Sequence, residues 1–302
     1  MGGSRYAFSC LSPPSWNHCA FVVKFHLTVP KASRGVLGMK VIDAKLMLLS
    51  ALLTVVALFT AQSYAKIDIK TAVGIWLFDE GKGDAAKDSS ENGNDGTLKS
   101  DPKWVDGKFG KGLEFDFGAA NYVIAPIPHS NSITVVLWAK YKSLPTANSG
   151  LFHAQETEDP GGAPATKKVG IWLENSKLLW GRLIQPDGTT MNFPKNESLE
   201  SDKWYHIALT ADENSKKGNL WVDGESVSEV TYNGKLGDFA FAKIGRQGTE
   251  TWSGVIDEVA VFNQALSKED IKAIMEGLDR AFAVSPASKL ATSWARVKEV
   301  IQ

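Results

Sequence analysis

The sequence predicts an all-β protein, a two-sheet antiparallel β-sandwich of the jelly-roll type with a short C-terminal helix and a helical tail. From residue 66 to residue 277, short runs rich in Val, Ile, Trp, Tyr and Phe alternate with Gly, Asn, Asp and Pro, which is the spacing of an all-β chain. Both faces of runs 132–140 and 254–262 are mostly apolar, as expected for strands covered on two sides. The dipeptides Asp187-Gly188 and Asp223-Gly224 are typical of hairpin turns.

The strands follow one another along this region, and one helix closes it. We expect strands at 72–78, 113–115, 122–125, 133–140, 150–153, 169–173, 178–183, 204–210, 219–222, 226–231, 241–244 and 254–262. Ser267 is a good N-cap with Asp270 in the first turn, so a helix begins there and ends near Gly277. One apolar face, made by Leu290, Trp294, Val297 and Ile301, predicts a second helix. The predicted domain is therefore 66–277, followed by a linker and amphipathic helical tail at 278–302.

The segment 39–65 has the composition of an export signal. Lys40 and Lys45 precede an apolar run at 46–61, and the chain then reads Ser63-Tyr64-Ala65, a pattern that signal peptidase accepts. We expect cleavage after Ala65 and a mature protein that is secreted or periplasmic. A membrane anchor is the alternative, but the apolar run is shorter than the roughly 20 residues that a spanning helix needs.

Residues 1–38 contain no Asp or Glu and carry both cysteines, Cys10 and Cys19. Either Met39 is the true start and 1–38 is an upstream extension, or this stretch is an unusually long n-region. The mature chain would have no cysteine and no membrane span, so its core or a metal ion must stabilise it. The formal net charge of −1 gives no indication of a nucleic-acid partner. The sequence does not indicate an oligomeric state.

Several phrases, in a fixed order, resemble the laminin G-like (concanavalin A-like) jelly-roll family of secreted bacterial proteins. They are WLFDEGKG at 76–83, DSSENGNDGTL at 88–98, GKFGKGLEFD at 107–116, NYVIAP at 121–126, SITVVLWAK at 132–140, WYHIALT at 204–210, LWVDGE at 220–225 and GVIDEVAVFNQALSKEDI at 254–271. Together they support the fold strongly. For function the resemblance is weak, because one fold hosts many activities.

Two acidic residues, Asp257 and Glu258, lie in the middle of an apolar strand and need donors or a cation, since a bare buried charge is costly. The loop DSSENGNDG at 88–96 is rich in oxygen atoms, which suit calcium. The resemblance implies a structural calcium ion held by Asp88, Asn92 or Asn94, and Asp257. The alternative is that the loop bonds its own backbone, as Asx turns do, and that Asp257 accepts from backbone N–H groups or an indole.

Mid-chain tryptophans suggest a carbohydrate surface, because exposed aromatic faces stack on sugar rings. The candidate ligand-binding residues are Trp172, Trp180, Arg182 and Trp252, with Gln185 and Gln247 as neighbouring amides. A two-residue turn between Trp172 and Trp180 would place them on opposite sides, whereas a three-residue turn would pair them. Core packing is the alternative for each Trp. Trp76, Trp138, Trp204 and Trp221 lie inside apolar runs, so we expect them in the core.

No catalytic constellation is recognisable. The paired-carboxylate strings E-x-D-x-x-E and E-x-D-x-x-x-E, the G-x-S-x-G elbow and the H-E-x-x-H zinc motif are absent. We therefore predict a secreted binding module that recognises carbohydrate or a cell-surface or matrix ligand, with calcium as a structural cofactor. The alternatives are a glycoside hydrolase or lyase of the same fold and an adhesive module that binds proteins.

Overall fold

The computed structural model describes residues 67–143, 148–158, 167–247 and 250–282. All of them belong to one unit of the chain, 62–302. The expected upstream extension, the signal peptide and the tail helix lie outside these residues. No helix in the described ranges is long and apolar enough to cross a membrane.

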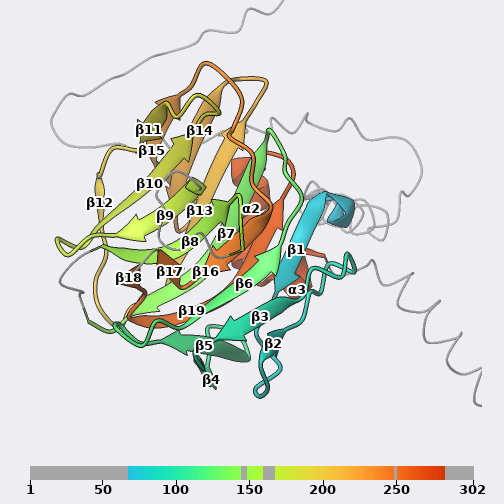
Figure 1. Ribbon diagram of the computed structural model, residues 1–302, viewed down its shortest axis with the longest axis vertical. Helices are drawn as coiled ribbons and strands as arrows, with labels where there is room; N and C mark the ends of the chain where they lie inside the picture. The colour runs from blue at the N-terminus through green and yellow to red at the C-terminus, as the bar shows by residue number, and fades with distance from the viewer. Residues whose placement is uncertain (1–66, 144–147, 159–166, 248–249, 283–302) are drawn as a thin grey trace, which may run out of the picture. The chain divides into compact units, whose positions relative to one another are not determined.

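The described chain forms two sheets that pack face to face as a sandwich (Figure 1), which confirms the predicted fold class. Sheet A has the order β15 (Glu225–Thr231), β14 (Lys217–Val222), β13 (Tyr205–Asp212), β7 (Ile133–Tyr141), β19 (Gly254–Phe262), β5 (Lys111–Phe115) and β4 (Lys103–Asp106), and β1 (Ala72–Trp76) also pairs with β19.

Sheet B completes the sandwich. Its order is β11 (Thr190–Asn192), β10 (Leu178–Ile184), β9 (Lys167–Leu173), β8 (Ser149–Gln155), β16 (Phe241–Ile244), β6 (Tyr122–Pro126), β3 (Gly96–Lys99) and β2 (Ala85–Ala86), with the short strands β12 (Glu197–Ser198), β17 (Arg246–Gln247) and β18 (Glu250–Thr251) beside it. Every run expected from the sequence overlaps a strand. The strands not expected, among them β3 and β12, are short and carry few apolar residues.

The main core lies between the two sheets and is built from alternate residues of their strands. Trp76, Phe115, Phe152 and Trp252 are among its largest fully buried side chains. Trp76 therefore lies in the core as expected, and its indole Nε1 donates to Asn94 O at 2.9 Å.

Three other tryptophans differ from the expectation. Trp204 and Trp221 are only half-buried. Trp138 is buried but lies in neither apolar cluster, and it contacts Lys108 and His206 instead. Strand alternation explains Trp138 and Trp221, because each follows an inward-pointing leucine, Leu137 and Leu220, and so points to the outer face of sheet A.

The outer face of sheet A is covered by α2 (Lys268–Met275) and α3 (Leu278–Ala281). The predicted N-cap is confirmed, because Ser267 and Asp270 form a capping box. Ile271, Ile274 and Leu278 pack on the sheet and form, with outward residues of β7, β13 and β19, a second apolar cluster. The helix α3 was not expected, since the sequence indicated a linker directly after Gly277.

Candidate functional site

The hairpin of β9 and β10 brings two tryptophans together on one face of sheet B. Glu174 N donates to Leu178 O at 3.0 Å, and Lys177 N donates to Glu174 O at 2.9 Å, so three residues form the turn. Lys177 has a φ of 71°, in the left-handed region that such turns require. Trp180 is therefore the direct cross-strand partner of Trp172. Of the two alternatives that the sequence left open, the three-residue turn is the one found.

This pair lies on the outer face of sheet B. The flanking residues Ile171 and Leu179 point into the main core, so Trp172 and Trp180 point away from it. The two rings stack with centroids 4.5 Å apart and an interplanar angle of 15°. Gly170 permits this packing, since a side chain at that position would collide with the Trp172 ring.

Arg182 lies over both rings. Its guanidinium carbon is 5.5 Å from the Trp172 centroid and 5.0 Å from the Trp180 centroid, within cation–π range. Arg182 Nε donates to Asn192 Oδ1 at 2.8 Å, which fixes the guanidinium plane. Lys195 Nζ is 5.1 Å from the Trp180 centroid and forms an ion pair with Glu174. We call Trp172, Trp180, Arg182, Asn192 and Lys195 the Trp–Arg cluster.

Burial divides this cluster into a base and a rim. Trp172 is 1% exposed and Trp180 is 7% exposed, so neither ring offers an open face to a sugar, contrary to the expectation. Arg182 is half-buried, while Asn192 and Lys195 are exposed. Partial burial lowers the pKa of Arg182 from its ordinary value, and the group stays charged at neutral pH. The tryptophans thus form a platform that carries the accessible polar groups.

The other expected ligand-binding residues lie elsewhere. Trp252 is 1% exposed and packs in the main core, where its ring meets that of Tyr141 edge to face, with centroids 6.3 Å apart. Trp252 is therefore placed with the core and not with the cluster. Gln185 is buried, and the side chain of Gln247 lies outside the described residues.

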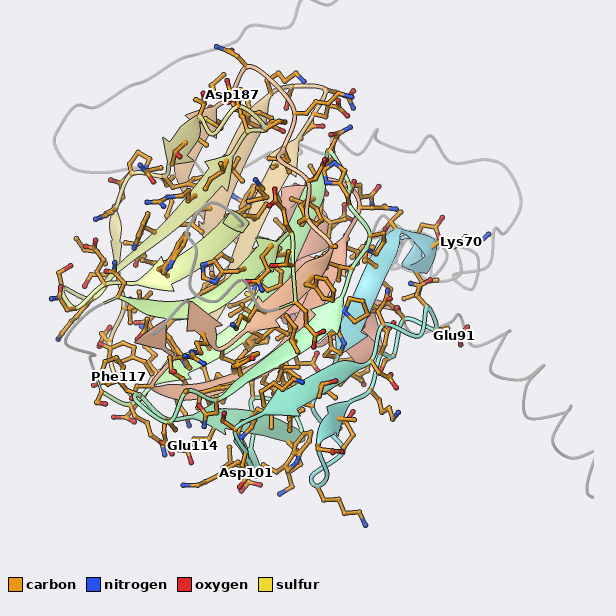
Figure 2. All side chains as sticks on the ribbon, viewed as in Figure 1. Lys70, Glu91, Asp101, Glu114, Phe117 and Asp187 are labelled. Atoms are coloured by element: carbon orange, nitrogen blue, oxygen red, sulfur yellow. The ribbon has the colours of Figure 1, made fainter. Side chains whose placement is uncertain are left out.

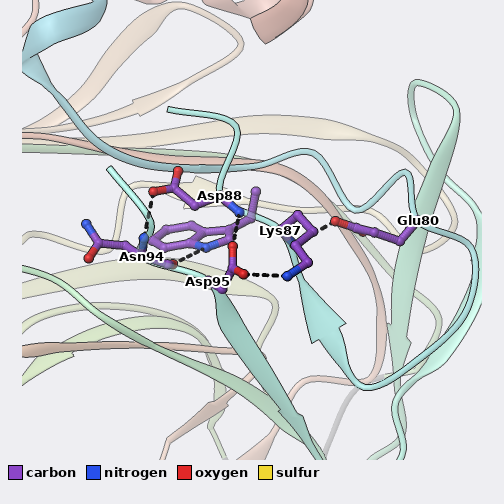
Figure 3. Close-up of polar contacts among 6 residues, drawn as sticks. Glu80, Lys87, Asp88, Asn94 and Asp95 are labelled. Carbon is purple, nitrogen blue, oxygen red and sulfur yellow. Dashed lines mark hydrogen bonds and ion pairs between the residues drawn. The ribbon is translucent and has the colours of Figure 1, made fainter. Parts of the chain in front are cut away.

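The oxygen-rich loop 88–96 is held by hydrogen bonds within the loop and to β1. Figure 3 shows those that join Asp88 to Asn94 and to Asp95. Asp88 accepts from the backbone N–H groups of Ile75 at 3.0 Å, Ser90 at 2.8 Å and Asn94 at 2.9 Å. The amides of Asn92 and Asn94 donate to the carbonyls of Ala72 and Val73, each at 2.8 Å. The bonds of Asp88 to Ser90 and Asn94 are those of the loop that bonds its own backbone, the alternative that the sequence left open, and the other bonds join the loop to β1.

Asp257 and Glu258 are satisfied by different segments of backbone. Asp257 accepts from Lys108 N at 2.8 Å and Phe109 N at 3.0 Å, in the β4–β5 turn. Glu258 accepts from Leu278 N at 2.6 Å, at the start of α3. Both carboxylates lie at a bulge in β19. Before the bulge one edge of β19 pairs with β5, and after it the same edge pairs with β1. Burial raises the pKa of each to about 7.

These contacts do not form a calcium cage. Asp88 and Asp257 hold separate backbone segments, and among the described residues no group of three His, Cys, Asp or Glu side chains is placed to hold a metal ion. Backbone N–H groups therefore already hydrogen-bond both carboxylates that the resemblance assigned to the ion. The melting experiment described below tests the calcium site that the resemblance implied.

Sequence reasoning missed Asn192, Lys195 and Gly170. Lys195 and Asn192 lie on or after the short strand β11, whose pairing with β10 places Asn192 opposite Arg182. Gly170 carries a usable signal, because a glycine within a strand often marks a close approach of another group.

Comparison with known proteins agrees with this architecture. A family model described as the concanavalin A-like lectin/glucanases superfamily matches residues 117–272. A search of the curated proteins finds no match.

Solved structures of similar fold include binding domains and enzymes. The binding domain of Paraclostridial Mosquitocidal Protein 1 has a TM-score of 0.55 at 14% identity, over 70% of this chain and 53% of that one. Domain 4 of the arabinanase AbnA from Geobacillus stearothermophilus, in complex with arabinotriose, has a TM-score of 0.51 at 20% identity. The match covers 67% of this chain and 97% of that domain. Trypanosoma rangeli sialidase has a TM-score of 0.53 at 19% identity, and the match covers 71% of this chain and 34% of the sialidase.

The chain thus spans about half the length of the mosquitocidal binding domain and a third of the sialidase. At these identities the likeness shows the fold alone. The family match covers more than half of the chain and includes β7, β13 and β19 of sheet A as well as the β9–β10 hairpin. The chain therefore belongs to the concanavalin A-like lectin/glucanases superfamily.

Proposed function

We propose that this protein is a secreted carbohydrate-binding module and that the Trp–Arg cluster on the outer face of sheet B is its ligand-binding site. The observation that carries the proposal is the stacked pair Trp172–Trp180 with Arg182 above it. A guanidinium fixed on two rings by one further hydrogen bond is a pre-organised donor, which reduces the entropy lost on binding.

The rest of the described surface favours a polar ligand over a protein partner. Only Ile69 and Phe117 are exposed large hydrophobic residues there, at 39% and 42% exposure. Figure 2 shows Phe117 and Lys70, the neighbour of Ile69, far apart. Protein interfaces are built around buried aromatic and apolar anchors that lie together, and no such patch is found among the described residues.

The similar structures support binding as the general role. They include a toxin binding domain and a domain solved with arabinotriose. Secretion follows from the signal-like segment 39–65, and N-terminal sequencing of exported protein should then begin at Lys66. A mature chain that retained Cys10 and Cys19 would contradict secretion by this route.

A panel of immobilised glycans and cell-surface proteins tests the function. Wild type should bind one class of glycan, and Trp180→Ala should lose about tenfold or more in affinity because the platform under Arg182 is gone.

Trp221→Ala is the matched control, since Trp221 is a half-buried tryptophan that packs on the apolar cluster of sheet A. It should bind as wild type does. Equal losses in both variants, or binding to proteins alone, would contradict the proposal. Sustained release of reducing sugar from a bound glycan would favour the enzyme alternative instead.

A further inference from the structure

We infer that the ligand of the Trp–Arg cluster is an anionic glycan, whose carboxylate or sulfate group is received by the guanidinium of Arg182. This inference rests on the proposed function and narrows it to one class of carbohydrate. Three observations on the described part of the chain support it: no carboxylate there pairs with Arg182, buried donors of the cluster have no partner there, and a second aromatic ring on the same sheet face carries cations.

The first observation concerns the partners of Arg182. Among the described residues, its hydrogen bond joins Nε to the neutral side chain of Asn192, and no carboxylate forms an ion pair with it. The nearby Glu174 is engaged with Lys195 and with Ser176 Oγ. The Nη nitrogens of Arg182 are therefore available within the described part of the chain. A guanidinium fork matches carboxylate and sulfate oxygens in a bidentate geometry.

The second observation is that the cluster offers donors rather than acceptors. The indole nitrogens of Trp172 and Trp180 are buried and have no hydrogen-bond partner in the described part of the chain. An unmade hydrogen bond at a buried donor costs free energy, so these groups favour a ligand that supplies oxygen acceptors. Asn192 uses its Oδ1 on Arg182, which leaves its amide hydrogens as further donors.

The third observation concerns the rest of the outer face of sheet B. Lys243 Nζ lies 4.0 Å and Arg246 Cζ 5.5 Å from the ring centroid of Tyr122, so a second aromatic ring on this face also carries cations. Lys168 on β9 is paired with Glu156 at 2.8 Å. Lys168 and Lys243 are buried, so of these three cations the half-buried Arg246 is the one that a ligand can reach. It extends the positive charge of the cluster along this face, which suits a chain of anionic sugars better than a single neutral residue.

Matched glycan pairs test the inference with the full chain. Polygalacturonate and its methyl ester share a backbone and differ in the carboxylate. Chondroitin sulfate and its desulfated form differ in the sulfate. A neutral arabinan completes the set. We expect binding to at least one anionic member, at least about tenfold tighter than to its neutral counterpart, and weaker at high salt. The pair that shows the difference identifies the anion.

Variants of Arg182 separate charge from geometry. Arg182→Gln should lose roughly 10- to 100-fold in affinity for the anionic glycan, and Arg182→Lys should lose an intermediate amount because it keeps the charge without the fork. Arg280→Gln is the matched control, since Arg280 also lies over an aromatic ring, 5.8 Å from the centroid of Phe109 on α3's side of the molecule. Unchanged melting temperatures establish that each variant is folded.

The outcomes distinguish the two proposals. Tight binding to arabinan that Arg182→Gln leaves intact would overturn the anionic ligand and keep the carbohydrate-binding function. Binding to anionic glycans that falls equally in Arg182→Gln and Arg280→Gln would overturn it too, because that pattern is general charge attraction. No binding to any glycan would overturn both proposals.

Discussion

The two outer faces of the sandwich differ in what lies on them. On sheet A, helices α2 and α3 cover an apolar cluster, and the buried carboxylates of Asp257 and Glu258 accept backbone N–H groups. On sheet B, the buried indoles of Trp172 and Trp180 have no partner among the described residues, and a cation lies above them. Sheet A also has a buried indole without a partner among the described residues, that of Trp138 with Lys108 over it, but helices α2 and α3 pack on that face. On sheet B the cluster presents the half-buried Arg182 and the exposed Asn192 and Lys195. We therefore assign stability to the first face and recognition to the second.

The largest expected effect is a loss of folding stability from a substitution on the outer face of sheet A. Ile271→Ala removes a fully buried side chain of α2 from the apolar cluster, and it should lower the free energy of unfolding by about 3 kcal/mol. Urea unfolding measures this loss. Glycan affinity at low temperature should stay at the wild-type value, and a parallel loss of affinity in the folded variant would show that the two faces are coupled.

The second expected effect is a pH dependence of the free energy of unfolding, and it arises from His206 on the same face of sheet A. His206 is 1% exposed, its ring has no hydrogen-bond partner in the described chain, and it meets Trp138, over which Lys108 lies. Burial lowers the pKa of His206 to about 3. The folded state thus favours the neutral ring, so its contribution to stability is complete above pH of about 6.5 and is lost as pH falls toward 3.

His206→Gln tests this sign. Between these pH values, the stability of wild type relative to the variant should fall by up to about 1.4 kcal/mol per pH unit, as measured by urea unfolding at several pH values. The control variant is Ser226→Ala on β15 of the same sheet, which changes no titratable group and should keep the wild-type pH slope over this range. A wild-type-minus-variant difference that grows on acidification would mean that His206 gains a partner when protonated.

The smallest expected effect is that of calcium on the melting temperature. Melting in EDTA and in millimolar calcium should differ little, because backbone N–H groups already satisfy Asp88 and Asp257. A rise of several degrees in calcium that Asp257→Asn abolishes and Ser285→Ala keeps would instead establish the ion that the family resemblance implied.

The fold was predictable because its strands are long and apolar. β7 and β19 are apolar on both faces, and this pattern reports burial on two sides without any knowledge of their neighbours. The capping box of α2 was predictable for a similar reason, since Ser267 and Asp270 act within one turn. The short strand β3 was hidden, because its pairing with β6 depends on residues distant in sequence.

The candidate site was only partly predictable. Trp172 and Trp180 could be chosen as residues, but their pairing depended on the length of one turn, and a shift of one residue would have separated them. Trp252 carries the same sequence signal and yet lies in the core. The roles of Arg182 and Asn192 depend on the register of β10 with β11, which is a property of the folded sheet.

The most direct test of recognition by sheet B observes the indole N–H groups themselves. The chain has 10 tryptophans, so a nitrogen–proton NMR spectrum should resolve their indole signals, and Trp→Phe variants assign them. On addition of the bound glycan, we predict that the signals of Trp172 and Trp180 shift most and that those of Trp76 and Trp221 stay in place. Shifts confined to Trp138 and Trp221, on the side of sheet A, would contradict the assignment of recognition to sheet B.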